Sequence, residues 1–438
     1  MNRSAIALFV AATLTACGGG DSGNDNSNNY QTCSATDQNI RFYNEMTEDY
    51  YWASELPDEF DPTAYADIYA TLEALRVPQD RFSYILTEDE YESLIVNAEY
   101  IGFGFSQQQV DSSTMKLRFV YENSPAWQAG LRRADQITAI DGVAVKQLLN
   151  SGNYEQALGD NEVGITRTIE WQRPDGQTQS ATLSKDYVAT NSVMGTTVWS
   201  VDEQTIGYFT LDSFINRTGN DLNRAFNRFA EEQVDALVID VRYNGGGLIR
   251  YANQAATQTA GVNVQGKTFI QYLFNEQNAS RNRAVSFNLV DGIQQLDLDK
   301  VVVLTTAASC SSSELIINSL KPHVEVTVIG QPTCGKPVGQ QPTELCDKVI
   351  FAINFETLNS AGEGGYFDGI APTCEVADAI VADWGDAADP LTGAAINYIQ
   401  QGRCPATSAP MSQLSGQQNQ LQQAPVFYNL KQKRASLQ

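Results

Sequence analysis

The sequence predicts a multidomain α/β protein with a small helical N-terminal domain, a small β-domain and an α/β core containing a largely parallel sheet. The chain has 438 residues, which exceeds one ordinary domain, and its 42% hydrophobic content is enough for several cores. The pattern changes along the chain from helical spacing to short alternating strands, and then to apolar strands that alternate with helices. Alternation of strand and helix indicates parallel strands joined by right-handed crossovers.

The composition shifts divide the chain into six expected segments. They are a signal peptide (1–16), a flexible Gly/Ser/Asn/Asp-rich tether (17–36), a helical N-terminal domain (37–97), a β-domain (98–188), an α/β core (189–404) and a disordered Gln-rich tail (405–438). The tail is rich in Gln, Ser and Ala and has no period, so we expect no packed structure in it.

The first residues are typical of an export signal. One basic residue, Arg3, precedes a short apolar run that ends in Leu14-Thr15-Ala16-Cys17, and this run is too short to span a membrane as a stable helix. Leu14 to Cys17 resembles the bacterial lipobox, in which the cysteine becomes the lipidated first residue. Gly18 resembles the pattern that sorts lipoproteins to the outer membrane. We therefore expect lipidation at Cys17 and a location at the outer membrane facing the periplasm; a plain cleaved signal with a chance cysteine is the alternative.

The charge and the histidine count exclude several function classes. A net charge of -24 argues against nucleic acid or anionic lipid as a partner, so we expect membrane contact only through the lipid anchor. The single histidine, His323, nearly excludes zinc hydrolases built on histidine ligands. We expect no metal and no other cofactor.

Six cysteines follow Cys17, and an even number in an exported chain favours disulfides. Proximity along the sequence suggests that Cys334 pairs with Cys346 within one hairpin. It likewise suggests that Cys374 pairs with Cys404 near the chain end.

The β-domain contains a short helix and a strand with clear boundaries. Ser124-Pro125 starts the helix and Gly130 ends it, while the strand from Asp135 closes in the turn Asp141-Gly142. This order resembles a bacterial PDZ domain, in which Gly102, Phe103, Gly104 and Phe105 occupy the place of the carboxylate-binding loop. The resemblance implies that backbone N–H groups bind the terminal carboxylate of a peptide whose chain extends the sheet edge. A small β-domain with a glycine-rich strand start is the alternative.

The core carries three candidate functional segments, each of which follows an apolar strand. An apolar strand, Val234–Val241, leads into the glycine-rich segment Arg242–Gly247, and a helix over Leu248–Ala260 follows. Later, an apolar strand at Val301–Leu304 leads into the serine cluster Ser309–Ser313 and a helix that Pro322 ends. A strand at Val326–Ile329 then leads into the loop around Lys336, and one more strand is expected at Val349–Phe355.

A serine on such a turn lies at a helix N-terminus, where free N–H groups can hold an oxyanion. A Ser-His-Asp triad would need His323, which lies one helix length from the serines, about 15 Å at the rise of an α-helix. A neutral lysine can activate a serine when burial depresses the pKa of its amine. Lys336 is the candidate, since Lys321 at a helix end is typical of a surface residue.

Two other interpretations remain. Gly330 to Lys336 has the spacing of a phosphate-binding loop, although Pro337 stands where a magnesium-binding Ser or Thr belongs. Ser311 and Glu314 also have the spacing of a capping box, so Ser311 could serve only to cap the helix.

The chain resembles the carboxyl-terminal processing proteases, or tail-specific serine proteases, over nearly its whole folded length. Ser309–Glu314 matches the family motif Ser-Ala-Ser-Ala-Ser-Glu, and Thr333–Pro337 matches Thr-Phe-Gly-Lys-Gly. Asp240–Gly247 matches the family segment Asp-Leu-Arg-x-Asn-x-Gly-Gly. The interval from Ser311 to Lys336 is 336 − 311 = 25 residues, as in the family.

The resemblance implies that Ser311 is the nucleophile, Lys336 the base and Gln340 the residue that orients the lysine, and that the N–H groups of Gly246 and Ser312 form the oxyanion hole. The implied function is that of an exported serine endopeptidase that captures proteins or peptides by their free C-termini and cleaves them through an acyl-enzyme. A catalytically silent PDZ adaptor that binds C-termini at the envelope is the alternative.

The sequence departs from the family pattern at three positions. Cys310 replaces an alanine beside the nucleophile, Cys334 replaces an aromatic residue, and Pro337 replaces a glycine beside the lysine. These changes either narrow the site or tie it into a disulfide that makes activity depend on oxidation.

Overall fold

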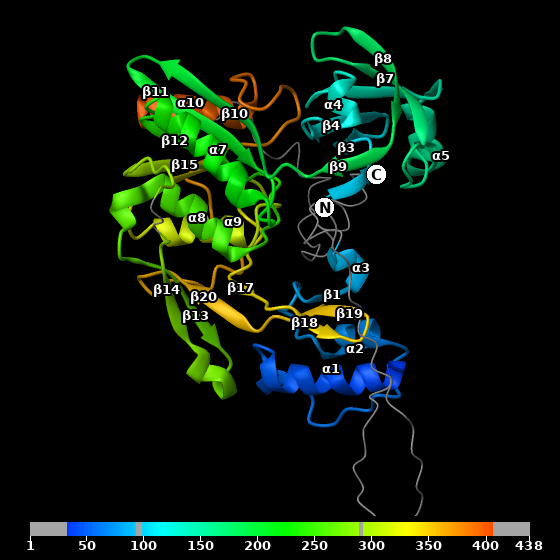
Figure 1. Ribbon diagram of the computed structural model, residues 1–438, viewed down its shortest axis with the longest axis vertical. Helices are drawn as coiled ribbons and strands as arrows, with labels where there is room; N and C mark the ends of the chain where they lie inside the picture. Colours follow the sequence, from blue (N-terminus) through cyan, green and yellow to red (C-terminus); the bar gives the residue numbers. More distant parts are fainter. Residues whose placement is uncertain (1–32, 93–98, 289–291, 406–438) are drawn as a thin grey trace, which may run out of the picture.

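The computed structural model describes residues 33–92, 99–288 and 292–405 (Figure 1). The expected signal peptide, Cys17, most of the tether and nearly all of the Gln-rich tail lie outside these ranges. Among the described residues, no helix combines the length and the apolar character that crossing a membrane requires.

The N-terminal region is helical, as predicted, and its end joins the core. Its elements are α1 (Ala35–Asp49), the 3-10 helix η1 (Ala53–Glu55), α2 (Ile68–Leu75), β1 (Tyr84–Thr87) and α3 (Glu88–Tyr91). Helix α1 begins where the side chain of Ser34 accepts the N–H of Asp37. Strand β1 pairs antiparallel with β19 (Lys348–Phe351) of the core. The apolar side of the helices packs against core residues such as Val338 and Ile350, so the two parts share one hydrophobic cluster.

The β-domain follows, at the upper right of Figure 1. Its elements are β2 (Glu99–Gly102), β3 (Phe105–Asp111), β4 (Thr114–Val120), α4 (Pro125–Gln128), β5 (Gln136–Ile140), β6 (Val143–Ala144), α5 (Val145–Ser151), α6 (Tyr154–Leu158), β7 (Thr166–Gln172), β8 (Thr178–Ser184) and β9 (Asp186–Ala189). The predicted short helix is present as α4, capped by Ser124 with Pro125 in its first turn. The main sheet has the order β3-β4-β5-β7-β8, with β6 paired to β5, so β3 is an edge strand.

The core is the largest part. Its elements are β10 (Val193–Val201), β11 (Gln204–Leu211), α7 (Thr218–Glu231), β12 (Ala236–Asp240), α8 (Ile249–Ala260), η3 (Gly261–Val264), β13 (Thr268–Phe274), η4 (Glu276–Arg281), β14 (Arg283–Ser286), β15 (Lys300–Thr305), α9 (Ser312–Leu320), β16 (Glu325–Gly330), β17 (Val338–Gly339), β18 (Thr343–Leu345), β19, β20 (Phe355–Leu358), β21 (Cys374–Glu375) and α10 (Pro390–Gln401).

The main sheet of the core has the order β10-β11-β12-β15-β16-β21 and is largely parallel, as predicted; only the β10–β11 pair is antiparallel. Alternate residues of its strands point to opposite faces. Val303 and its neighbours on one face pack with α7, α8 and α9, whereas Val302 and its neighbours on the other face pack with α10. The sheet is thus covered on both sides, which explains its continuous apolar strands.

Three segments that the sequence singled out leave the same edge of this sheet. Arg242–Gly247 follows β12, Ser309–Ser313 follows β15, and the loop with Lys336 follows β16, and these three strands are adjacent and parallel. The carboxyl ends of parallel strands meet at one edge, where α/β proteins place their functional sites. The topology therefore gathers these segments although up to about a hundred residues separate them.

One predicted strand is wrong in extent. The segment Val349–Phe355 forms two short strands in different sheets, β19 paired with β1 and β18, and β20 paired with β13 and β17. The chain between them leaves the ladder because its backbone bonds elsewhere: the N–H of Ile353 donates to Ser83 Oγ, and the carbonyl of Ile353 accepts the N–H of Tyr51.

The disulfides agree with one predicted pairing and contradict the other. Cys374–Cys404 is present, as predicted. The predicted Cys334–Cys346 pair is wrong, because the structure joins Cys33 to Cys346 and Cys310 to Cys334. The hairpin of β18 and β19 carries Cys346 to the start of α1, whereas Cys334 follows β16 and therefore reaches the serine turn that follows β15.

Candidate active site

Ser311 lies on a strained turn between β15 and α9. Its backbone has φ 55° and ψ −115°, a left-handed conformation that a residue other than glycine adopts rarely and mainly at functional sites. The residue is the N-cap that directly precedes α9, and its backbone N–H donates to Glu314 Oε2 at 2.8 Å. A simple capping serine has extended backbone. This geometry favours a functional role beyond the cap that the sequence left open.

The glycine-rich segment after β12 packs directly against Ser311. Gly246 has φ 105°, and a Cβ on it would lie 2.8 Å from Ser311 Cβ, so no side chain fits there. Its backbone N–H, which we predicted to bind an oxyanion, donates to Asn244 Oδ1 at 2.8 Å. The second predicted donor belongs to Ser312, the first residue of α9, whose hydroxyl donates to the carbonyl of Gly247 at 2.7 Å. The oxyanion hole stays a prediction, and Gly246 would have to exchange Asn244 for the substrate.

Lys336 is buried, with 4% of its surface exposed. Burial lowers the pKa of its ammonium to about 8, although the nearby charges of Asp80 and Glu314 act in the opposite direction. The ammonium lies 5.5 Å from the centre of the Phe82 ring, an apolar neighbour contributed by the N-terminal region. A lysine with such a pKa is partly neutral near neutral pH and can act as a base.

Glu314 connects the two candidate catalytic residues. Its buried carboxylate accepts the backbone N–H of Ser311 at 2.8 Å and that of Lys336 at 2.9 Å, both on Oε2. Oε1 accepts the N–H of Gly335 at 2.8 Å and the hydroxyl of Thr333 at 2.5 Å. Burial raises the pKa of the Glu314 carboxyl, while these donors lower it. One side chain of α9 thus fixes the backbone on both sides of the site.

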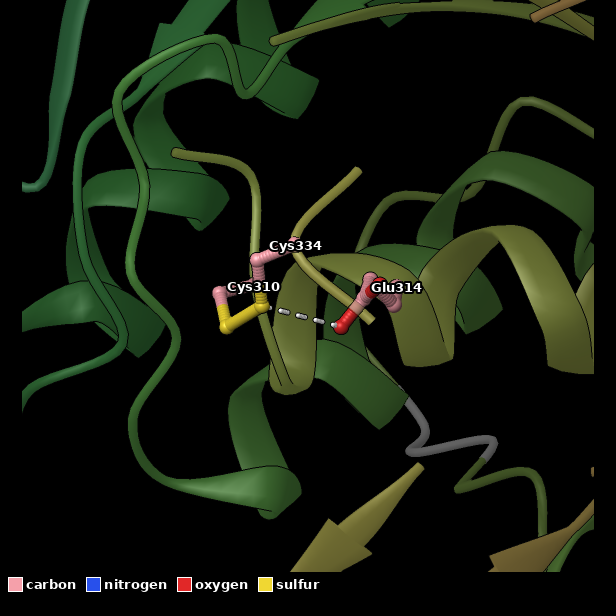
Figure 2. A group of neighbouring side chains, drawn as sticks. All are labelled: Cys310, Glu314 and Cys334. Atoms are coloured by element: carbon pink, nitrogen blue, oxygen red, sulfur yellow. Dashed lines mark hydrogen bonds between the residues drawn. A yellow bond between two sulfur atoms is a disulfide. The ribbon is translucent and has the colours of Figure 1, made fainter. Parts of the chain in front are cut away.

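Figure 2 shows Cys310, Glu314 and Cys334 gathered at this point. Their sulfur and carboxylate atoms lie close enough to resemble a cation site. In this state they do not make one, because Cys310 and Cys334 are joined in a disulfide and the carboxylate already accepts four hydrogen bonds.

Ser311, Lys336, Gln340 and Gly246 all line one cavity of about 500 Å³. The N-terminal region, the β-domain and the core all contribute to its wall. Its aromatic side chains are Tyr84, Tyr91, Phe119, Phe214, Tyr243, Tyr272, Phe351 and Phe355. A concave, mostly apolar cavity with a few polar groups is typical of a substrate site. Gln340, which we predicted to orient Lys336, also lines this cavity, and its contact with Lys336 stays a prediction.

Two groups of candidate residues lie elsewhere. His323 is not among the residues that line the cavity; it lies past the far end of α9, where its Nε2 is 3.1 Å from Ser360 Oγ. The predicted peptide-binding residues Gly102, Phe103, Gly104 and Phe105 belong to the β-domain. There the side chains of Phe103 and Phe105 are buried, and the segment leads directly into the edge strand β3.

Sequence reasoning missed the residues that support the lysine. Arg81 donates to the carbonyls of Cys334 at 2.9 Å and Phe367 at 2.7 Å, and Asp80 accepts from the hydroxyls of Tyr50 and Ser83. The available signal was the sequence Asp80-Arg81-Phe82 at the end of the helical region. A charged pair followed by an aromatic residue does not by itself indicate which residues of the core these side chains contact.

Three family models match this chain. Residues 205–376 match peptidase family S41, residues 37–84 match the peptidase S41 N-terminal domain, and residues 119–160 match a PDZ domain. The chain belongs to peptidase family S41. The predicted family and the predicted fold class are therefore confirmed.

Curated relatives and a solved structure agree with this S41 membership. A carboxyl-terminal-processing protease of Picosynechococcus sp. is 26% identical over 290 residues, covering 64% of this chain and 66% of the relative. A protein of the same name from Synechocystis sp. is 27% identical over 295 residues, covering 66% and 65%. This chain thus spans slightly less than two-thirds of these relatives.

A crystal structure described as that of an S41 protease from Bacteroides fragilis superposes on this chain with a TM-score of 0.70 at 21% sequence identity. The match covers 83% of this chain and 97% of the Bacteroides fragilis chain, and it shows that the two share a fold.

Proposed function

We propose that the protein is a serine endopeptidase in which Ser311 attacks the scissile carbonyl and Lys336 is the base. The proposal rests above all on one observation: both residues line one cavity, and Glu314 holds the backbone of each. Burial supplies the property that a lysine base needs, because it lowers the pKa of the amine to about 8.

In this mechanism neutral Lys336 takes the proton of Ser311 Oγ as the oxygen attacks the peptide carbonyl. The ammonium then gives that proton to the leaving amine, and an acyl-enzyme remains on Ser311. Water, activated by the again neutral lysine, hydrolyses the ester and releases the enzyme. Gln340, which lies in the same wall, orients the amine.

A fluorophosphonate probe tests the dyad, because it labels an activated serine without a peptide substrate. We expect labelling of the wild type at Ser311, no labelling of Ser311→Ala, and loss of labelling in Lys336→Ala. Peptide binding by a protein that is never labelled and never cleaves would instead identify a silent adaptor.

The PDZ domain is proposed to capture the free C-termini of substrates. The segment from Gly102 to Phe105 runs from the last residue of β2 to the first residue of β3, and β3 lies at the edge of its sheet, where an added peptide strand can pair. Comparing kcat/KM for one peptide as free acid and as amide tests this step. We expect kcat/KM for the amide to be lower by a factor of about ten or more, because a charge-assisted contact with the carboxylate is lost.

We also propose that the protein is exported and anchored by lipid at Cys17, at the outer membrane facing the periplasm. The support is the lipobox-like sequence before Cys17 and the glycine that follows it. Mass spectrometry of the mature N-terminus tests this: a multiply acylated cysteine is expected, since one chain binds membranes only marginally. An unmodified mature N-terminus would overturn it.

A further inference from the structure

The disulfide Cys310–Cys334 joins the two halves of the candidate site. Cys310 directly precedes Ser311, and Cys334 lies two residues before Lys336. We propose that this disulfide, together with Glu314, is a positioning clamp that sets Ser311 against Lys336, so that the enzyme cleaves efficiently only in its disulfide form. The inference rests on the proposed function and identifies positioning residues for it.

Hydrogen bonds on either side of the disulfide hold the same two segments. The N–H of Cys334 donates to the carbonyl of Ser309 at 3.0 Å, and the N–H of Cys310 donates to the carbonyl of Asn244 at 3.0 Å. Glu314 adds the bonds to Ser311 and Lys336 described above. The serine turn, the lysine loop and the glycine-rich segment are therefore joined at one place.

Positioning matters here because a serine and its base exchange a proton only over hydrogen-bond distance, about 3 Å. The two segments follow different strands, β15 and β16, and the whole of α9 lies between them in the chain. Ser311 itself is held in a left-handed backbone conformation, which persists only when its surroundings impose it. The disulfide is one such constraint, directly beside the strained residue.

Reduction would remove this constraint without changing any side chain of the dyad. The sulfur–sulfur bond takes up two electrons and two protons from a dithiol and gives two thiols, while the dithiol becomes a disulfide. Cys310 is fully buried and Cys334 is half-buried, so we expect attack at the Cys334 sulfur. The new thiols lie next to the Glu314 carboxylate, whose Oε2 is 3.6 Å from Cys334 Sγ.

The chain offers a matched control for removal of this disulfide. Cys310–Cys334 closes a separation of 24 residues and Cys374–Cys404 one of 30, so the chain-entropy effects of the two bonds are similar. Cys374–Cys404 links β21 to the segment after α10, and neither of its cysteines adjoins a residue that lines the cavity, whereas Cys310 directly precedes Ser311. The variants Cys310→Ala/Cys334→Ala and Cys374→Ala/Cys404→Ala therefore differ mainly in position relative to the site.

The experiment measures kcat, KM and the rate of fluorophosphonate labelling for both double variants. We expect Cys310→Ala/Cys334→Ala to lose at least tenfold in kcat and in labelling rate with KM within about threefold. Cys374→Ala/Cys404→Ala should keep kcat within about twofold. Equal kcat values for wild type and Cys310→Ala/Cys334→Ala would overturn the inference.

A second measurement covers the case in which Cys310→Ala/Cys334→Ala fails to fold. Wild-type protein and Cys374→Ala/Cys404→Ala are treated with dithiothreitol, assayed, and reoxidised, with circular dichroism to follow the fold. Loss of activity at unchanged circular dichroism, reversed by oxidation, and mapped by thiol alkylation to Cys310 and Cys334, supports the clamp. Full activity with both thiols alkylated contradicts it. If oxidised wild type neither cleaves peptides nor is labelled, the proposed function fails instead.

Discussion

The guanidinium of Arg81 donates a hydrogen bond to the carbonyl oxygen of Cys334 at 2.9 Å. Arg81 belongs to the N-terminal region, and Cys334 lies in the loop after β16 that carries Lys336. The same guanidinium donates to the carbonyl of Phe367 at 2.7 Å. Arg81 therefore links the loop that carries Lys336 to the core segment around Phe367. The N-terminal region is therefore part of the support of the candidate site.

Replacing Arg81 should consequently lower catalysis. In Arg81→Gln, the carbonyls of Cys334 and Phe367 lose a charged donor, which costs about 1.5–3 kcal/mol per such contact. We expect kcat to fall about tenfold with little change in KM, because Arg81 does not line the cavity. Steady-state kinetics check this. Arg76→Gln is the control: Arg76 pairs with the exposed Glu73 and should matter little. Wild-type kcat in folded Arg81→Gln would contradict the role.

The PDZ loop can be tested with two glycines of the same domain. A Cβ on Gly104 would lie 2.0 Å from Ser124 Cβ, whereas a Cβ on Gly142 would meet nothing within 4 Å, and both glycines have positive φ. Gly104→Ala should raise KM for free-acid peptides about tenfold at unchanged kcat. Gly142→Ala should cost about 1 kcal/mol of stability and leave KM unchanged. The ratio of kcat/KM for the free-acid peptide to that for the amide should also fall in Gly104→Ala and stay unchanged in Gly142→Ala. An unchanged ratio in Gly104→Ala would show that Gly104 does not take part in binding the C-terminus.

The sequence predicted the parts of the site that depend on local pattern. The apolar run before the serines, Pro322 after the helix, and the family-like spacing from Ser311 to Lys336 each leave a direct trace in the sequence. The parallel strands then place these segments at one edge, which follows from the alternation of strand and helix. For that reason Ser311 and Lys336 could be named from the residues themselves, whereas Gln340 and Gly246 were named only through the resemblance to the family.

The remaining parts depend on contacts over long separations. The pairing of Cys33 with Cys346 spans 313 residues, and no local pattern indicates it. Glu314 was read only as a capping residue, because its bonds to Gly335 and Lys336 arise from the packing of α9 against the loop after β16. The strand at Val349–Phe355 was predicted whole, since its apolar residues give no sign that Ser83 draws the backbone away at Ile353.

The rate of cleavage should depend on pH through Lys336. Burial lowers the pKa of its ammonium to about 8, and the base is the neutral amine, so the active fraction grows as pH rises. We expect kcat/KM to increase about tenfold per pH unit below pH 8 and to level off above it. His323→Ala should leave this profile unchanged, because His323 lies outside the cavity. A profile that rises at lower pH, below the ordinary pKa of histidine, and that disappears in His323→Ala would refute the lysine mechanism, because burial lowers the pKa of His323.

Lys336 should also make the protein less stable than an apolar residue would. Its pKa falls from 10.5 to about 8 on folding, so the folded state binds this proton more weakly than the unfolded state does. The penalty is complete below pH 8, shrinks as pH rises from 8 to 10.5, and vanishes above. At 1.36 kcal/mol per pH unit it amounts to about 3 kcal/mol at pH 7.

Lys336→Met keeps most of the side-chain volume and removes the charge. We expect it to abolish cleavage and to raise the free energy of unfolding by about 3 kcal/mol at pH 7, measured by urea titration. At pH 10 the difference from wild type should fall below about 1 kcal/mol, because the lysine in the folded wild type is then neutral. Lys321→Met, directly after α9, is the control with a solvent-exposed lysine outside the cavity, and it should keep cleavage. If Lys336→Met is inactive and less stable than wild type at pH 7, neighbouring groups of the folded protein stabilise the charged ammonium. Burial would then not lower the pKa of Lys336 enough for it to act as a base.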